Sequence, residues 1–153
     1  MPSVTPILDA DTAVRLRVAI ARLSRRLRPT AAGSAAGLTP TRISVLLTVV
    51  REQRIRISTL AAAEGLNPTM LSRAISQLSE DGLIARVSDD GDRRSAWVQS
   101  TAAGRRVAER MRRERTDALN RALDELTAAD RRVIERALPA LERLGEHLQD
   151  RPS

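Results

Sequence analysis

The fold of this chain is set by residues 57–101, which read ISTLAAAEGLNPTMLSRAISQLSEDGLIARVSDDGDRRSAWVQST. This stretch predicts a helix, a turn, a second helix and then a two-stranded hairpin. Gly65 should end the first helix, because glycine alone adopts a positive φ at little cost. Ser58 is expected to cap that helix. Asn67 is suited to cap the second helix, with Pro68 at its first position, where a missing N–H costs nothing.

The second helix is predicted to have one apolar face and one polar face. The apolar residues recur at spacings of three and four, at Leu71, Ala74, Ile75 and Leu78. The other face presents Thr69, Met70, Ser72, Arg73, Ser76 and Gln77. Ala61 is small enough for the two helices to cross closely. This pattern is typical of a helix-turn-helix, whose second helix enters the major groove of DNA.

The hairpin that follows is predicted to have strands at 83–88 and 95–100 and a turn-rich tip between them. Arg93 and Arg94 lie at the tip, from which they could reach the phosphate backbone or the minor groove. Trp97 is expected to pack in the core of this wing. Arg56 and Ile57 could add a short third strand.

Residues 66–104 resemble the MarR family of winged helix-turn-helix repressors. The matching motifs are Leu71-Ser72-Arg73, Gly82-Leu83-Ile84, Asp92-Arg93-Arg94 and Thr101-Ala102-Ala103-Gly104, in this order. Ser100 departs from the pattern, because the family usually has leucine there. The resemblance implies that Arg94 enters the minor groove, oriented by an ion pair with Asp92. It also implies a homodimer formed by terminal helices, often released from DNA by a small apolar or phenolic effector.

Several residues are candidates for contacting DNA. Arg73 could bond a guanine edge with two hydrogen bonds, or it could contact a phosphate or remain solvated. Hydroxyl bonds and a contact to a thymine methyl could come from Thr69, Met70, Ser72 and Ser76. Arg86 could touch a phosphate, although pairing with Asp89 or Asp90 is equally open. Asn67 is interpreted as a cap rather than a base reader.

Composition narrows the class of protein. The 153 residues carry a net charge of +7, with arginine as the sole cation. Basic chains suit anionic partners such as double-stranded DNA. The excess, however, lies in residues 1–50 and not in the predicted reading helix. The lack of cysteine excludes disulfides and thiolate metal sites. No enzyme motif or cofactor-binding motif is present, and the single histidine, His147, makes a poor metal site.

The flanking segments complete a mainly α prediction. We expect an N-terminal arm and dimerisation helix in 1–37, a winged helix-turn-helix lobe in 38–104, and C-terminal dimerisation helices in 105–153. Residues 29–37 are expected to form a mobile connection. Thr101 should cap a long exposed helix, and Thr127 with Asp130 should open a last helix. Without a membrane-length apolar run or a signal pattern, a cytoplasmic protein is expected.

The sequence therefore predicts a homodimeric, sequence-specific transcriptional regulator, most simply a ligand-responsive repressor at a near-palindromic operator. If the family's effector crevice carries over, candidate lining residues are Leu16, Ile20, Val45, Val49 and Met111. Two alternatives remain open. One is a non-specific architectural DNA-binding protein with the same charge, and the other is a helical dimer that acts through protein partners.

Overall fold

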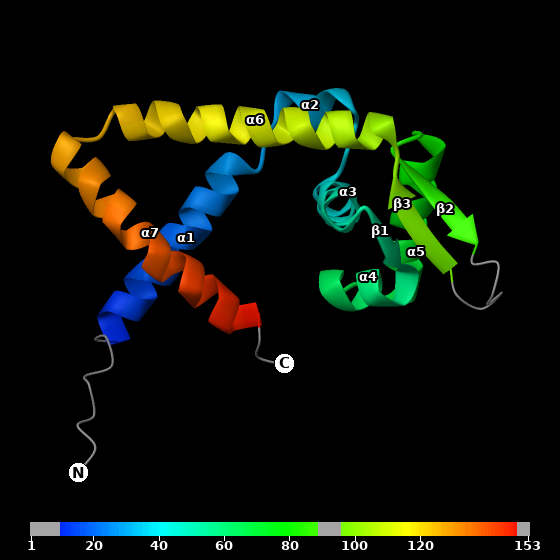
Figure 1. Cartoon of the computed structure of the whole chain (residues 1–153), viewed down its shortest axis with the longest axis horizontal. Coiled ribbons are helices and arrows are strands. Elements are labelled where there is room, and N and C mark those ends of the chain that lie inside the picture. Colours follow the sequence, from blue (N-terminus) through cyan, green and yellow to red (C-terminus); the bar gives the residue numbers. More distant parts are fainter. Residues whose placement is uncertain (1–9, 89–95, 150–153) are drawn as a thin grey trace, which may run out of the picture. The chain divides into compact units, whose positions relative to one another are not determined.

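A computed structural model describes residues 10–88 and 96–149, and the chain is mainly helical (Figure 1). In chain order the elements are α1 (Ala10–Leu27), α2 (Ala31–Ala35), α3 (Pro40–Glu52), β1 (Arg54–Arg56), α4 (Ile57–Glu64), α5 (Pro68–Glu80), β2 (Ile84–Ser88), β3 (Ala96–Ser100), α6 (Ala102–Asp124) and α7 (Ala128–Gln149). The chain divides into two compact units, Met1–Arg115 and Thr116–Ser153. The predicted three-part division by function stays a prediction.

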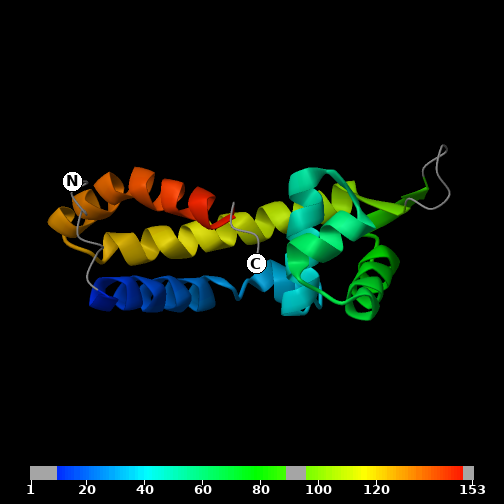
Figure 2. The same ribbon diagram turned by 90° about the horizontal axis from the view of Figure 1, so that it is seen from below.

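The first unit has one aliphatic core, because the chain has no phenylalanine or tyrosine to fill it. Its fully buried side chains come from α3, α4, α5, both wing strands and α6, and the largest are Leu46, Leu60, Leu71, Ile75, Leu78, Ile84 and Met111. This core fixes the helix-turn-helix to the sheet. Figure 2 shows α5 and the β2–β3 pair at the same end of the unit.

The helix-turn-helix has the predicted boundaries, with one difference at its start. Gly65 has φ 60°, in the left-handed region, and the N–H of Leu66 bonds the carbonyl of Ala61 at 3.3 Å. The Asn67 side chain accepts a hydrogen bond from the N–H of Met70 at 2.9 Å, as a cap should. The predicted Ser58 cap is wrong. Residue Arg56 occupies that cap position without a side-chain bond, because β1 runs directly into α4.

The wing is a three-stranded antiparallel sheet in the order β1-β3-β2. Ile55 pairs with Val98, and Ile84 pairs with Ser100; all four side chains are buried. Ser100 replaces the expected leucine without leaving a polar group unpaired. Its carbonyl and hydroxyl oxygens both accept from Nη1 of Arg105, at 3.0 and 3.3 Å. A buried serine is stable here because α6 supplies the donor.

The segment predicted to be a mobile connection contains the helix α2, so that prediction is wrong. Thr30 is buried, and its hydroxyl accepts from the N–H of Gly33 at 3.1 Å. The carboxylate of Glu114 on α6 accepts from the N–H of Ala32, at 3.1 and 3.3 Å to its two oxygens. A carboxylate at a helix N-terminus stabilises it by charge as well as by hydrogen bonding.

The start of α6 is tied to the turn before β2. The hydroxyl of Thr101 accepts from the N–H of Gly104 at 3.0 Å and lies 2.7 Å from the carbonyl oxygen of Gly82, to which it can donate. Gly104 lies so close to Leu83 that a Cβ on it would overlap the Leu83 carbonyl oxygen. This close approach requires glycine and locks the long helix to the root of the wing.

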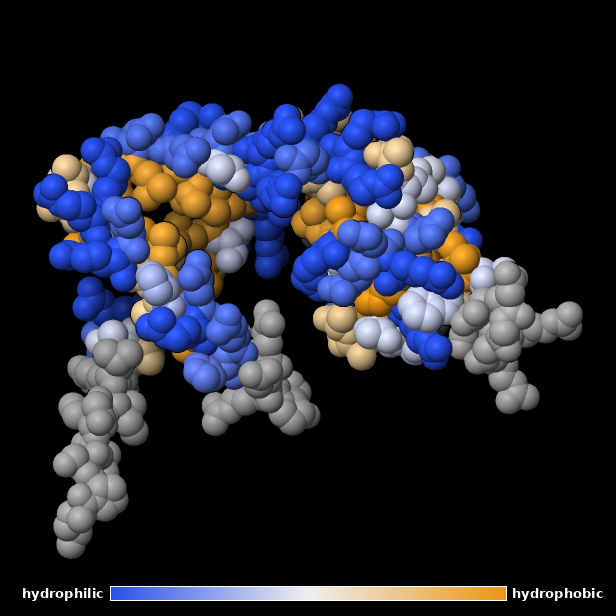
Figure 3. Space-filling model, viewed as in Figure 1, coloured by the Kyte–Doolittle hydropathy of each residue, from blue (hydrophilic) through white to orange (hydrophobic). Residues whose placement is uncertain are grey.

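The second unit contains the end of α6 and the whole of α7. As predicted, Thr127 and Asp130 form a capping pair, with the Asp130 N–H donating to the Thr127 hydroxyl at 3.1 Å. Pro139 lies inside α7. Large apolar side chains remain exposed along α7, among them Val133, Leu138, Leu141 and Leu148. Figure 3 shows apolar side chains at the surface along α7 and beside the adjoining end of α6.

Candidate nucleic-acid interface

Helix α5 presents two chemically distinct faces, as its sequence predicts. Leu71, Ala74, Ile75 and Leu78 are buried in the core of the first unit. The opposite face carries the exposed residues Thr69, Met70, Ser72, Arg73 and Gln77, with Ser76 half-buried at its margin. Met70 is 49% exposed, although it is apolar. The helix therefore offers a cation, hydroxyl groups, an amide and a thioether on one accessible side, which suits contact with base edges and phosphates.

Arg86 connects the wing to this helix. Its guanidinium Nη2 donates a hydrogen bond to the hydroxyl oxygen of Ser76 at 3.2 Å. The two alternatives for Arg86, a phosphate contact or pairing with Asp89 or Asp90, stay predictions, because residues 89–95 lie outside the described residues. Arg86 is itself exposed, beside the polar side of α5.

The predicted wing-tip residues Asp92, Arg93 and Arg94 lie outside the described residues. The strands that carry them are described up to their last pair, Ser88 with Ala96. The wing itself is therefore present as an antiparallel hairpin of the predicted kind, and the roles of its three tip residues stay predictions.

Trp97 does not pack in the core, contrary to the sequence-based expectation. Its neighbour Val98 is fully buried and faces α3, so Trp97 must point to the other face of the sheet. There the guanidinium carbons of Arg54 and Arg56 lie 4.7 and 5.0 Å from the centroid of the indole ring. Sequence reasoning missed this cluster, although the alternation of Arg54-Ile55-Arg56 opposite Val98 was a signal for it.

An open cavity of about 840 Å³ lies within the first unit. It is bordered by the end of α1 and by α3, and its other walls include Glu64, Leu66 and Arg115. The Glu64 carboxylate accepts from the hydroxyl of buried Thr48 at 2.6 Å. Nε of Arg115 is buried without a hydrogen-bond partner, while its Nη2 lies 3.4 Å from the carbonyl oxygen of Arg28.

The predicted effector residues lie elsewhere in the same unit. Val45, Val49 and Met111 are fully buried in the core, and Leu16 and Ile20 lie on α1. None of the five borders the cavity. Their role in effector binding stays a prediction, and sequence reasoning gave no signal for Arg115 or Glu64 as cavity residues.

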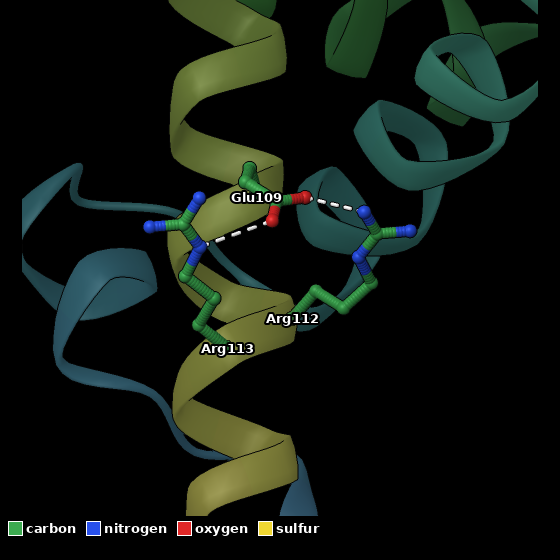
Figure 4. Close-up of polar contacts among 3 residues, drawn as sticks. All are labelled: Glu109, Arg112 and Arg113. Atoms are coloured by element: carbon green, nitrogen blue, oxygen red, sulfur yellow. Dashed lines mark hydrogen bonds and ion pairs between the residues drawn. The ribbon is translucent and has the colours of Figure 1, made fainter.

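Among the described residues, the group with a clearly shifted pKa is Glu109, which lies on α6 and not on α5. Hydrogen bonds from Arg113, at 3.0 Å, and Arg112, at 2.5 Å, lower the pKa of Glu109 below its usual value of 4.5 (Figure 4). The pairs have the helical spacings of four and three residues. Such exposed pairs stabilise a helix weakly.

Within residues 10–88 and 96–149 there is no cluster of three or more histidine, aspartate or glutamate residues with metal-binding geometry. The same part of the chain contains no helix that is both long and apolar enough to span a membrane.

Solved structures of other proteins share this architecture. The chain is 30% identical to a Pseudomonas aeruginosa protein described as a transcriptional regulator, with a TM-score of 0.75 over 90% of this chain and 96% of that one. The Thermotoga maritima transcriptional regulator Tm0710 gives a TM-score of 0.76 at 20% identity, covering 93% and 99% of the two chains. NadR, solved in complex with 4-hydroxyphenylacetate, gives 0.61 at 20% identity, covering 92% and 97%.

No curated protein matches the chain in sequence. Residues 38–96, which contain α3, the helix-turn-helix and most of the wing, match the MarR family. Together with the 30% identity over nearly the whole length of a solved regulator, this match shows that the chain belongs to the MarR family of transcriptional regulators.

Proposed function

We propose that this protein is a cytoplasmic, homodimeric repressor that binds a near-palindromic operator and is released by a small effector. The observation that carries the proposal is the two-faced α5 helix. Its apolar side is anchored by Leu71, Ile75 and Leu78, and its polar side is exposed next to the wing. A rigidly backed helix with accessible polar side chains is what direct readout of the major groove requires.

The proposed reading residues are those of the exposed face. Arg73 is the principal base contact, since a guanidinium can bond O6 and N7 of guanine together. Hydroxyl and methyl contacts come from Thr69, Met70, Ser72 and Ser76, while Arg86, Arg93 and Arg94 contact the backbone or minor groove, with Asp92 orienting Arg94. Most of the other exposed arginines lie on helices outside the winged lobe and serve solubility and electrostatic attraction to DNA.

Exposed apolar surface supports the dimer. On α7, Val133 is 55% exposed, Leu138 47% and Leu148 65%, which is costly for a helix left in water. Burial against a second copy, through 1–37 and 105–153, removes this cost. A two-fold dimer would present two α5 helices to successive major grooves about 34 Å apart, with 38–104 as the DNA-binding lobe.

The cavity supports an effector site. It is bordered by two guanidinium-bearing residues, Arg28 and Arg115, so it favours a small molecule that carries a carboxylate. NadR was solved with such a molecule, 4-hydroxyphenylacetate. Leu66, directly before the α5 cap Asn67, and Glu64, three residues before it, border the same cavity. Occupancy of the cavity would therefore act on the start of the reading helix.

The test measures binding to promoter duplex and to random duplex at one fixed salt concentration. A specific regulator should prefer its site by roughly a thousandfold or more. Arg73→Ala should reduce this preference by about ten- to a hundredfold if Arg73 reads a base. The matched control is Arg143→Ala, which removes an exposed arginine from α7 and should leave the preference for the promoter duplex unchanged.

If the wild-type protein binds promoter duplex and random duplex about equally, the proposal is overturned in favour of an architectural DNA binder. Absence of any salt-dependent DNA affinity would favour a helical dimer that acts through protein partners. If Arg73→Ala weakens binding to both duplexes equally and lowers the salt slope of binding by about one, Arg73 contacts a phosphate instead of a base.

A further inference from the structure

The outer face of the wing sheet carries a cationic and aromatic cluster that the reading helix does not use. The register places Arg56, Trp97 and Val87 in one row across the three strands, and Arg54, Gln99 and Ala85 in the next. The residues between them, Ile55 and Val98, face the core. The arginines and Gln99 are exposed, and Trp97 is half-buried beneath the two guanidinium groups.

The indole ring holds both guanidinium groups in place. A cation over a tryptophan face is attracted by the ring quadrupole, and a stacked guanidinium keeps its N–H donors free at its edge. Within the described residues, no carboxylate forms an ion pair with Arg54 or Arg56. Both guanidinium groups are therefore held against one ring with no ion-pair partner among the described carboxylates, which lowers the entropy cost of binding an anion.

We propose that this cluster, formed by Arg54, Arg56 and Trp97, binds the phosphate backbone of DNA that flanks the operator. The proposal rests on the proposed function, since it needs a DNA complex that brings flanking duplex to the wing. Each wing of the dimer would then contact DNA at its tip and also along its outer face. The bound segment of DNA would extend beyond the major-groove half-sites at both ends.

Continuity favours DNA over an acidic protein as the occupant. The cluster lies on β1 and β3, and β3 is paired with β2, whose Arg86 bonds Ser76 on the reading helix. The register pairs Arg86 with Val98, so Arg86 lies on the other face of the sheet from Trp97, and the strands themselves connect the cluster to α5. Guanidinium forks match phosphate oxygens in geometry, and they make contacts that position a protein without reading sequence.

The chain itself supplies the reporter for the test, because Trp97 is its sole tryptophan and it has no tyrosine. Full-length protein is titrated with the promoter duplex it selects, once with long flanks and once trimmed to the half-sites. We expect the long duplex to change Trp97 emission and the trimmed duplex to leave it unchanged. Arg54→Gln/Arg56→Gln should weaken binding of the long duplex alone and lower its salt slope by about four per dimer, one for each lost phosphate contact.

The control is Arg132→Gln/Arg136→Gln, which removes the same charge from the exposed surface of α7. It should match the wild-type slope. If the double substitution on β1 lowers the thermal midpoint, the single substitutions test the same claim, each with an expected change of about two per dimer.

Three outcomes would overturn the inference. The first is that the β1 variant keeps the wild-type salt slope for DNA binding while the wild-type protein still prefers its operator. That result would leave the proposed function intact. The second is unchanged Trp97 emission with the long duplex. The third is an equal emission change with polyglutamate at the same salt, which would assign the cluster to an acidic protein. If the wild-type protein shows no preference for its operator over random duplex, the proposed function is refuted instead.

Discussion

Helix α5 of the helix-turn-helix lobe and helix α7 are both amphipathic, but only the apolar side of α5 is buried within the chain. In the lobe, α5 buries its whole apolar stripe, and Leu71, Ile75 and Leu78 are at most 1% exposed. On α7 a stripe with the same spacing leaves Leu138 and Leu141 at 47% and 40% exposure. An amphipathic period therefore indicates that a helix needs a partner surface, but it does not indicate whether that partner is in the same chain.

The largest effect should come from adding one carbon to the lobe, in Gly104→Ala. The new Cβ would overlap the carbonyl oxygen of Leu83 and lie 3.3 Å from Cδ1 of Leu46, and the backbone oxygen cannot rotate away. We expect the free energy of unfolding to fall by roughly 3 kcal/mol or more. Chemical denaturation followed by circular dichroism measures this loss.

The matched control is the same substitution on α7, Gly145→Ala. No atom lies within 4 Å of the position where its Cβ would be, and the residue is helical. Alanine there should raise stability by roughly 0.5–1 kcal/mol, because glycine is the poorer helix former. Gly145 lies one turn after Leu141, on the stripe that we propose a second copy covers, so a destabilising Gly145→Ala would mean that the second copy packs too closely there for a Cβ.

The next effect concerns the exposed stripe. Leu138→Asp/Leu141→Asp puts two charges into the surface that we propose a second copy covers, so the dimer dissociation constant should rise by about a hundredfold or more. Analytical ultracentrifugation at micromolar concentration measures the change. The lobe should stay folded, since neither leucine contributes to its core.

The control is Arg132→Asp/Arg136→Asp, which puts two aspartates on the polar side of α7 instead. It changes the charge more than the leucine substitutions do, and it should leave the dimer intact. A dimer that survives the leucine substitutions would show that α7 is not the interface.

The smallest effect is a pH dependence on the exposed surface of α6. Hydrogen bonds from Arg113 and then Arg112 lower the pKa of Glu109 in the folded protein. The stabilisation is therefore present above the unfolded pKa and is lost as pH falls through the lower, folded pKa. Glu109→Gln should slightly reduce the thermal midpoint at neutral pH, and the two proteins should converge in acid.

The matched control here is Glu142→Gln, an exposed α7 carboxylate that forms no ion pair within the described part of the chain. It should show no such convergence. High salt should also shrink the Glu109 difference, because exposed pairs are screened. A difference that persists below the folded pKa would mean that Glu109 acts through something other than its charge.

The sequence predicted most of the lobe because its signals are local. Asn67-Pro68, Gly65 and the stripe on α5 each depend on residues a few positions apart, and the structure confirms all of them. In the same way, Thr101 and Thr127 were found as caps because a cap bonds an N–H three residues on.

The failures involve partners far away in the chain. Helix α2 depends on the carboxylate of Glu114, 82 residues from Ala32, and a run of small residues gave no sign of it. Trp97 was assigned to the wrong face because one residue decides the face of a strand, and an aromatic side chain was assumed to point inward. The residues that line the cavity were missed because they come from segments far apart in the sequence, between Ser24 and Arg115.

The contact between Gly104 and Leu83 has a consequence for mutational surveys. Every single-nucleotide change that replaces a glycine introduces a side chain with at least one carbon, so no missense change at this codon avoids the Leu83 oxygen. In a saturation screen for lost regulation, position 104 would score as strictly as a residue that contacts DNA. A scorer who ranks positions by intolerance alone would mistake a steric boundary for a binding determinant.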